Sequence, residues 1–241
     1  MTTSARTAVP QANLLAVGLY NPAEVSHLLG IPLSTVHRWI EGYSFPLARH
    51  FRGKKPPIFS AALPRTDGRL TLTFLDLVQL RVVRAFREAG VPLPRIRTAA
   101  EFAGDFFGTS HPLAHLRLKT EGKGVWSDIE TAAAREVMDL SATGQQAFPE
   151  IVADSLAEIS YATETGLADR WFAAGPGGGV VLDPEVAFGA PVVVGANVPT
   201  AIIWGQSQTE PDADRLASWF RLDVRQVHDA LRFEQRLARA A

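Results

Sequence analysis

The chain has 241 residues, of which 46% are hydrophobic and 20% charged, and its formal net charge is −1. This length and composition provide enough apolar surface for one large domain or two to three small ones, which excludes an intrinsically disordered chain. The sequence contains no cysteine, which excludes disulfide frameworks, thiolate nucleophiles and cysteine-ligated zinc.

Residues 1–19 predict a flexible lead, because they lack the charged start, long apolar core and cleavage pattern of a signal peptide. The uncharged stretch 186–209 is interrupted by Gly189, Pro191 and Pro199, whereas a membrane-spanning helix needs about 20 mostly apolar residues. We therefore expect no membrane segment and a cytoplasmic protein.

The next segment, YNPAEVSHLLGIPLSTVHRWIEGY at 20–43, predicts two short helices joined around Gly30. Asn21 is placed as the N-cap of the first helix, Pro22 as its first residue and Glu24 as the carboxylate of a capping box. Two short helices around a glycine turn are typical of a helix-turn-helix.

The second of these helices has two different faces. The residues expected to face the core are Leu33, Val36, Trp39 and Ile40. The residues expected to face outward, and to contact base edges or phosphates, are Ser34, Thr35, His37 and Arg38. A three-helix core with a solvated polar face would produce the same pattern, so this motif alone leaves both interpretations open.

Positive charge is concentrated around the second helix. The stretch 33–69 holds seven arginines and lysines against two carboxylates. We interpret 44–57 as a loop whose cations lie along a DNA backbone: Arg49, Arg52, Lys54 and Lys55. A basic N-terminal third in a nearly neutral chain favours nucleic-acid binding.

Further along the chain, alternation around Asp67-Gly68 predicts a β-hairpin over 58–74. A helix capped by Thr73 and ended by Gly90 follows, and then a shorter helix over 91–106. The middle segment predicts a mixed or antiparallel sheet that carries one helix. Its strands are expected in 113–129, 135–148 and 167–183, its helix in 149–161, and the C-terminal helices in 200–206, 211–220 and 223–238.

No catalytic or metal motif emerges from the chain. His111 and His115 are four apart, but Pro112 between them argues against a helical ligand pair and no third ligand is near. The glycine run at 175–179 lacks the lysine and spacing of a phosphate loop. We expect a protein that is not an enzyme, with no cofactor and no metal.

The order of two short helices, a basic loop with a hairpin, and TFLDLVQLRVVRAFREAGVPLPRIR resembles the winged-helix domain of MerR-type regulators over 20–103. Pro32 occupies the position of the usual capping serine, and no long dimerising helix follows. The resemblance implies contact with a DNA groove, and the promoter-untwisting mechanism of that family is not carried over.

The segment DPEVAFGAPVVVGANVPTAII is similar to the opening of a small helix-turn-helix domain found in type II toxin–antitoxin systems. The matching positions are Gly189, Pro191, Val192, Gly195, Val198 and Pro199, while Ala196-Asn197 replace a Thr-Arg pair. Together the two ends of the chain resemble a long VapB-type antitoxin, which pairs with a PIN-domain ribonuclease toxin.

This second resemblance implies a mechanism. A PIN toxin cuts RNA with carboxylates that hold divalent metal, and an antitoxin can offer an arginine that neutralises them. The candidate toxin contacts are Trp219, Phe220, Arg225, Arg232 and Arg236. The aromatic pair could instead fill this domain's own core, and the arginines could form a solvated face or a second nucleic-acid surface.

We therefore predict an α+β protein with four parts: the lead at 1–19, a winged helix-turn-helix at 20–105, a sheet-rich segment at 106–185 and a helical, helix-turn-helix-like domain at 186–241. It would be a homodimeric antitoxin that represses its own promoter through operator DNA. The alternatives are a ligand-sensing regulator with Trp126 and Trp171 in its pocket, and an enzyme with an undetected site in the middle segment.

Overall fold

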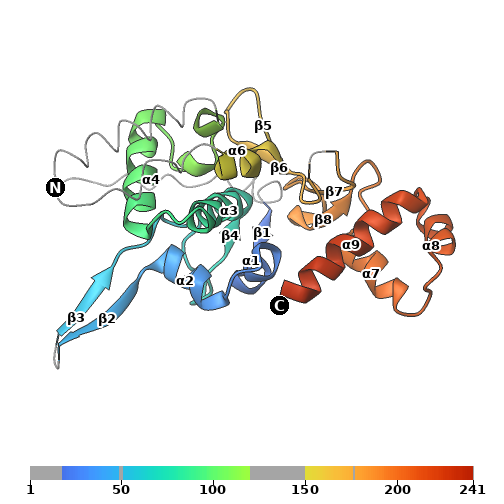
Figure 1. Cartoon of the computed structure of the whole chain (residues 1–241), viewed down its shortest axis with the longest axis horizontal. Helices are drawn as coiled ribbons and strands as arrows, with labels where there is room; N and C mark the ends of the chain where they lie inside the picture. Colours follow the sequence, from blue (N-terminus) through green and yellow to red (C-terminus); the bar gives the residue numbers. More distant parts are fainter. Residues whose placement is uncertain (1–17, 49–50, 120–149, 176, 241) are drawn as a thin grey trace.

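The computed structural model describes residues 18–48, 51–119, 150–175 and 177–240. Over these residues helices pack with small antiparallel sheets (Figure 1), which confirms the predicted α+β class. The N-terminal helices are α1 (Pro22–Leu29), α2 (Leu33–Glu41), α3 (Phe74–Glu88) and α4 (Leu93–Phe107).

Helix α1 begins and ends as predicted. The Asn21 side chain accepts hydrogen bonds from the backbone N–H groups of Ala23 and Glu24, and the Glu24 carboxylate accepts one from the N–H of Asn21. Gly30 ends the helix in the left-handed region at φ 58°, which a residue without a side chain adopts at no steric cost.

Helix α3 is held by a second capping box. The Thr73 hydroxyl accepts from the N–H of Asp76, and the Asp76 carboxylate accepts from the N–H of Thr73. Asp76 also accepts from the N–H of Ala62, although burial raises the pKa of this carboxyl. Almost every α3 side chain from Phe74 to Phe86 is buried, which makes α3 the centre of the N-terminal core.

The region between α2 and α3 corrects two predictions. The basic stretch is a β-hairpin, formed by β2 (Tyr43–Ala48) and β3 (Phe51–Lys55), and not a loop. The predicted hairpin around Asp67-Gly68 is reduced to an isolated bridge between Thr66 and Arg69. Its second half enters β4 (Leu72–Thr73), which pairs with β1 (Leu19–Tyr20).

The middle segment combines one confirmed helix with one wrong assignment. Helix α6 (Glu150–Ala157) lies within the predicted range 149–161, but it ends at Ala157, and residues 159–161 form a strand instead of its last turn. Residues 113–119 were predicted as strand, but η2 (Pro112–Ala114) is a 3-10 turn and 116–119 are helical. The remaining predicted strands, 120–129 and 135–148, lie outside the described residues.

A four-stranded antiparallel sheet follows α6 in the order β5-β6-β7-β8. Its strands are β5 (Ile159–Tyr161), β6 (Ala168–Trp171), β7 (Val180–Leu182) and β8 (Pro191–Val193). The glycines at 175 and 177–179 lie between β6 and β7, outside any strand, as predicted. Between β7 and β8 lies the 3-10 turn η3 (Ala187–Gly189).

Helix α3 is tied to this sheet region by one arginine. The Arg81 guanidinium donates to Ser155 Oγ at 2.5 Å and pairs with the Glu158 carboxylate at 2.5 Å. It also lies over the Trp171 ring, 5.1 Å from the centroid. Only 11% of the Arg81 side chain is exposed, so the N-terminal helices and the sheet share a desolvated polar joint.

Three helices end the chain: α7 (Thr200–Ser207), α8 (Ala213–Phe220) and α9 (Val224–Ala240). They match the three predicted helices. The first half of α9 packs in a small cluster with α7 and α8 through Val227 and Ala230. Its second half places Phe233 and Leu237 in the large core that holds α1 to α4 and the sheet, and its C-terminal end approaches α1 (Figure 1).

Candidate nucleic-acid interface

Helix α2 divides into a buried face and a polar outer face. Val36, Trp39 and Ile40 are buried as predicted. The expectation for Leu33 is wrong, because its side chain is 44% exposed at the start of the helix. An exposed apolar side chain at this position could contact the methyl group of a thymine in the major groove.

The predicted outward residues of α2 do face outward to different degrees. Ser34 and Arg38 are exposed, Thr35 is half-buried, and the His37 side chain is 40% exposed. Pro32 precedes the helix without any side-chain cap. The outer face of α2 therefore presents hydroxyls, an imidazole and a guanidinium, all of which hydrogen-bond to nucleic acid.

Glu41 is the centre of a polar network on this face. Its carboxylate is 2.9 Å from His37 Nδ1 and accepts from Arg65 Nε, also at 2.9 Å, with a second nitrogen of the same guanidinium bound to it. The hydrogen bond with Arg65 is the main reason that the pKa of Glu41 is lowered. The carboxylate is therefore ionised at neutral pH and holds the Arg65 and His37 side chains in place.

The hairpin β2–β3, which we call the wing, projects from the body beside α2 (Figure 1). Its register pairs Ser44 with Lys54 and Pro46 with Arg52. Directly opposite residues in an antiparallel pair share one face of the sheet, so Arg52 and Lys54 lie on the same face. Both are exposed, and together they form a short row of positive charge.

The other face of the wing is aromatic and cationic. Tyr43 pairs with Lys55, and Phe45 pairs with Gly53. The Phe45 ring lies directly over Gly53, where an added Cβ would be 2.4 Å from the ring, so a larger residue at position 53 would displace the ring. Lys55 Nζ lies 5.7 Å from the centre of the Phe45 ring.

Arg38 of α2 contacts this aromatic face of the wing. The Arg38 guanidinium lies over the Tyr43 ring, 5.0 Å from its centroid, and cation–π contacts of this kind hold a cation in place without neutralising it. Arg38 therefore lies on the same face of the wing as Lys55, whereas Arg52 and Lys54 lie on the opposite face, so the hairpin carries positive charge on both faces. The remaining predicted DNA contact, Arg49, lies outside the described residues, as does Trp126.

Sequence reasoning missed Tyr43, Phe45 and Arg65 as parts of this surface. The alternation Tyr43-Ser44-Phe45 signals a strand, but the neighbouring prolines, glycine and cations masked it. No local signal brings Arg65 to Glu41, because the contact joins residues 24 apart in the chain.

The predicted toxin contacts are spread over α8 and α9. Trp219 is 55% exposed and does not fill the core, whereas Phe220 is half-buried and packs against the small C-terminal cluster. Arg225 is exposed. Trp219 and Arg225 are thus accessible on the α8–α9 unit, and Phe220 is mainly structural.

The other two arginines of that set, Arg232 and Arg236, line a groove of about 500 Å³ between α9 and the glycine-rich turn. Arg232 pairs with Asp229, and Arg236 donates to the carbonyl of Ala173 at 2.5 Å. Arg239 lines the same groove. Three guanidinium groups against one carboxylate make this groove positively charged.

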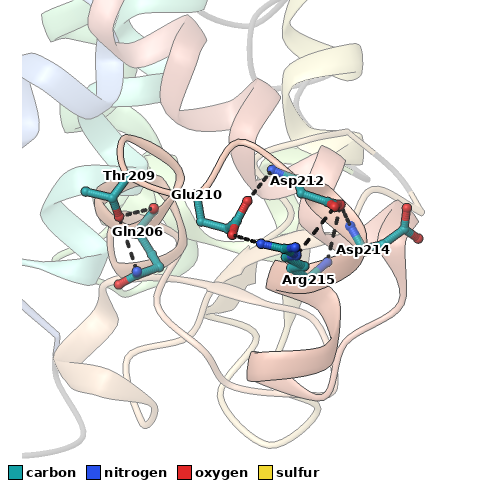
Figure 2. Close-up of polar contacts among 6 residues, drawn as sticks. All are labelled: Gln206, Thr209, Glu210, Asp212, Asp214 and Arg215. Atoms are coloured by element: carbon teal, nitrogen blue, oxygen red, sulfur yellow. Dashed lines mark hydrogen bonds and ion pairs between the residues drawn. The ribbon is translucent and has the colours of Figure 1, made fainter.

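A polar network fixes the start of α8, as Figure 2 shows. Asp212 caps the helix through the N–H groups of Asp214 and Arg215, and Arg215 pairs with Glu210 at 3.0 Å. The loop between α7 and α8 is thereby held in one conformation, which sets the direction in which α8 presents Trp219.

Neither a metal cluster nor a membrane helix is found in the described part of the chain. No group of three histidines and carboxylates among these residues is placed to hold a metal ion. His111 is half-buried and burial lowers its pKa. None of the helices within the described ranges is long and apolar enough to cross a membrane.

The fold and this surface define a winged helix-turn-helix protein of the DNA-binding class. Residues 18–100 match the family model described as "Putative DNA-binding HTH domain". The chain belongs to the family of the antitoxin VapB45: it is 31% identical over 223 residues to "Putative antitoxin VapB45" of Mycobacterium tuberculosis, an alignment that covers 89% of this chain and 93% of that one.

Two further comparisons agree over nearly the full length. The chain is 29% identical over 239 residues to the M. tuberculosis protein Rv2308, with 92% of each chain covered. The crystal structure of Rv2018 from M. tuberculosis superposes with a TM-score of 0.68 at 29% identity, covering 89% of this chain and 97% of that one.

Proposed function

We propose that this protein is the antitoxin of a type II toxin–antitoxin system. In this proposal residues 20–105 bind operator DNA and repress the protein's own promoter, while residues 186–241 bind and inhibit a PIN-domain ribonuclease. It acts in the cytoplasm as a non-catalytic homodimer. The observation that carries the DNA half is the exposed positive surface formed by α2 and the wing, in a chain of the antitoxin VapB45 family.

The proposed duplex contact uses both parts of this surface. Helix α2 enters the major groove with Ser34, Thr35, His37 and Arg38 toward the bases, since recognition helices read bases from their first turns. Arg52, Lys54 and Lys55 of the wing approach the phosphates, where cations add affinity without sequence information. Arg38, held over Tyr43, is in the right place to bridge the two.

Dimerisation follows from the small size of one such contact. A single helix-turn-helix buries little DNA surface, and paired half-sites one helical turn apart are the usual way to gain affinity. We therefore expect an operator with two related half-sites whose centres are separated by a multiple of about 34 Å.

The toxin half of the proposal is supported by the accessible residues of α8 and α9. Trp219 serves as an apolar anchor, because exposed tryptophans are the commonest hot spots of interfaces. Arg225, Arg232 and Arg236, with Phe220 behind Trp219, present a cationic face to the carboxylate cluster of a PIN active site. Arginine binds carboxylates bidentately, which suits it to displace their metal.

The test is co-expression with the product of the adjacent gene. Under the proposal the two proteins co-purify, growth arrest by the ribonuclease is relieved, and Trp219→Ala with Arg225→Ala restores the arrest. Deleting 186–241 is not a fair test, because Phe233 and Leu237 of α9 belong to the large core. If the double variant neutralises the ribonuclease as well as the parent does, the toxin contact lies on other residues. If no nuclease co-purifies, this half of the proposal is refuted.

The matching test of the DNA half uses the duplex upstream of the gene. The triple variant Arg38→Ala, Lys54→Ala, Lys55→Ala is expected to lose binding while its circular dichroism spectrum stays that of the parent. It should still neutralise the ribonuclease, because all three residues lie on α2 and the wing, outside residues 186–241 that bind the ribonuclease in this proposal. Unaltered DNA binding by this variant would refute the assignment of the surface.

A further inference from the structure

The outer face of α2 holds one histidine whose hydrogen-bonding state is fixed by its neighbours. His37 Nδ1 lies 2.9 Å from Glu41 Oε2, one helical turn further along. A carboxylate that is ionised can only accept hydrogen bonds. Nδ1 must therefore carry the proton in this pair.

The ionised state of Glu41 has its own support. Arg65, from the segment between the wing and β4, donates two guanidinium hydrogens to the same carboxylate. Arg65 also donates to the carbonyl of Gly68, so its guanidinium group is held between Glu41 and Gly68. We call the three residues Arg65, Glu41 and His37 the clamp. It joins α2 to the segment between the wing and β4, and its contact with Nδ1 restricts the orientation of the His37 ring.

The proton on Nδ1 determines the hydrogen-bonding role of Nε2, the other ring nitrogen of His37. In a neutral imidazole with its proton on Nδ1, Nε2 is a hydrogen-bond acceptor. Among the residues that the structure describes, Glu41 is the only hydrogen-bond partner of His37, and 40% of the His37 side chain is exposed. With Nδ1 held against Glu41, the acceptor nitrogen is left available on a partly exposed ring.

The neighbouring charges do not compete for this nitrogen. Arg38 is turned onto the Tyr43 ring, and Arg65 is occupied by Glu41 and Gly68. Ser34, one turn earlier, has only a hydroxyl. His37 is thus the one imidazole on α2, and its contact with Glu41 places a proton on Nδ1.

From this geometry we propose that His37 is a specificity-determining residue that reads an exocyclic amino group in the major groove, with Glu41 and Arg65 as positioning residues. The inference rests on the proposed DNA-binding function. In the major groove adenine offers N6–H₂ and cytosine N4–H₂ as donors, whereas guanine and thymine offer only acceptors at the corresponding positions. An acceptor nitrogen selects adenine or cytosine at one position of each half-site.

The size of the effect follows from single base contacts. A mismatched base pair in a specific site typically weakens binding by about 5- to 100-fold, and a single hydrogen bond belongs at the lower end of that range. Loss of the clamp should remove most of this preference while leaving the other base positions and the phosphate contacts intact, because neither Glu41 nor Arg65 has to touch DNA for the clamp to work.

The experiment is selection from a randomised duplex library by the full chain at about pH 8, where imidazoles are neutral. Four proteins are compared: the parent, His37→Ala, Glu41→Gln and the control Glu88→Gln. Glu88 pairs with Arg84 four residues earlier on α3, at 2.7 Å, so the control removes an equivalent exposed pair remote from α2. Nitrogen-15 NMR of the histidine rings, recorded without DNA, reports which nitrogen of His37 carries the proton.

We expect the parent to select adenine or cytosine at one position per half-site, and both His37→Ala and Glu41→Gln to lose that preference at the same position. The NMR spectra should show the Nδ1–H form in the parent and in Glu88→Gln, and a mixture in Glu41→Gln. The inference is overturned if Glu41→Gln selects the parental sequence, or if the parental His37 carries its proton on Nε2. A parent that selects no sequence at all would overturn the proposed DNA function and this inference with it.

Discussion

The wing provides the most quantitative prediction. Arg52 and Lys54 are exposed, lie on one face of the hairpin and have no ion pair within the described part of the chain. Replacing both with threonine, which favours strands, removes two positive charges and keeps the hairpin. If each cation meets one phosphate, the slope of log K against log salt becomes shallower by about 0.9 per contact, or about 1.8 in total.

The same relation gives the loss of affinity. At about 0.15 M salt each phosphate contact contributes about fivefold, so the double variant should bind its duplex about 30-fold more weakly. Fluorescence anisotropy at several salt concentrations measures both quantities. The matched control is Arg225→Ala with Arg239→Ala, which removes the same charge from exposed positions of α9. An unchanged slope in the wing variant, or an equal decrease in the α9 control, would refute the assignment of the wing to the DNA backbone.

Three further predictions concern stability and the partner surface. Arg81→Met removes the cation that pairs with the Glu158 carboxylate, which then keeps only the Trp171 indole N–H as donor, and should lower the free energy of unfolding by about 3 kcal/mol. Urea denaturation measures this loss, and a loss below about 1 kcal/mol would show that the joint is solvated. Glu41→Gln should destabilise by about 0.5 kcal/mol at pH 7; because the folded-state pKa of Glu41 is lowered, this difference is fully present above the unfolded pKa and is lost as the pH falls through the lower folded-state pKa, so a difference that did not decrease on acidification would argue against the ion pair. Trp219→Ala should weaken ribonuclease binding by at least about 30-fold with little change in melting temperature, since the side chain is 55% exposed; calorimetric titration that detects no change would remove it from the interface.

The helices were predictable because their signals are local. The capping boxes at Asn21–Glu24 and Thr73–Asp76 fix where α1 and α3 begin. Each involves residues three apart, so the sequence window contains the whole interaction. The same reasoning placed α7, α8 and α9 within a few residues of their bounds.

The wing was missed because its strand character depends on distant packing. Pro46 and Gly53 normally weaken a strand, and the cations suggest a solvated loop. In the structure Gly53 makes room for the Phe45 ring, and the register brings Tyr43 opposite Lys55. A cross-strand contact of this type cannot be read from one strand alone.

The exposed polar residues of the site could be predicted from the sequence, but the residues that they contact could not. Ser34, His37 and Arg38 could be assigned to the outer face of α2 from helical periodicity. Their partners could not: Arg65 reaches Glu41 across 24 residues, and Tyr43 meets Arg38 only because the wing folds back beside α2. Tertiary contacts determine which of these polar groups remain available to a ligand.

For the predicted toxin contacts on α8 and α9, too, the sequence indicated the residues but not their tertiary contacts. Periodicity placed arginines along α9, but the fold ties Arg236 to the carbonyl of Ala173 and Arg232 to Asp229. It also leaves Trp219 exposed, where apolar composition alone favoured a core position. The order of the sheet strands and the insertion of Phe233 into the large core were equally beyond local signals.

Hydrogen–deuterium exchange of the full chain with its upstream duplex shows which segments bind DNA. We expect DNA to slow exchange in α2 and in the wing, over 33–55, and to leave α8 and α9 unchanged. Protection confined to the C-terminal helices, with 33–55 exchanging as in the free protein, would show that α2 and the wing do not bind the duplex.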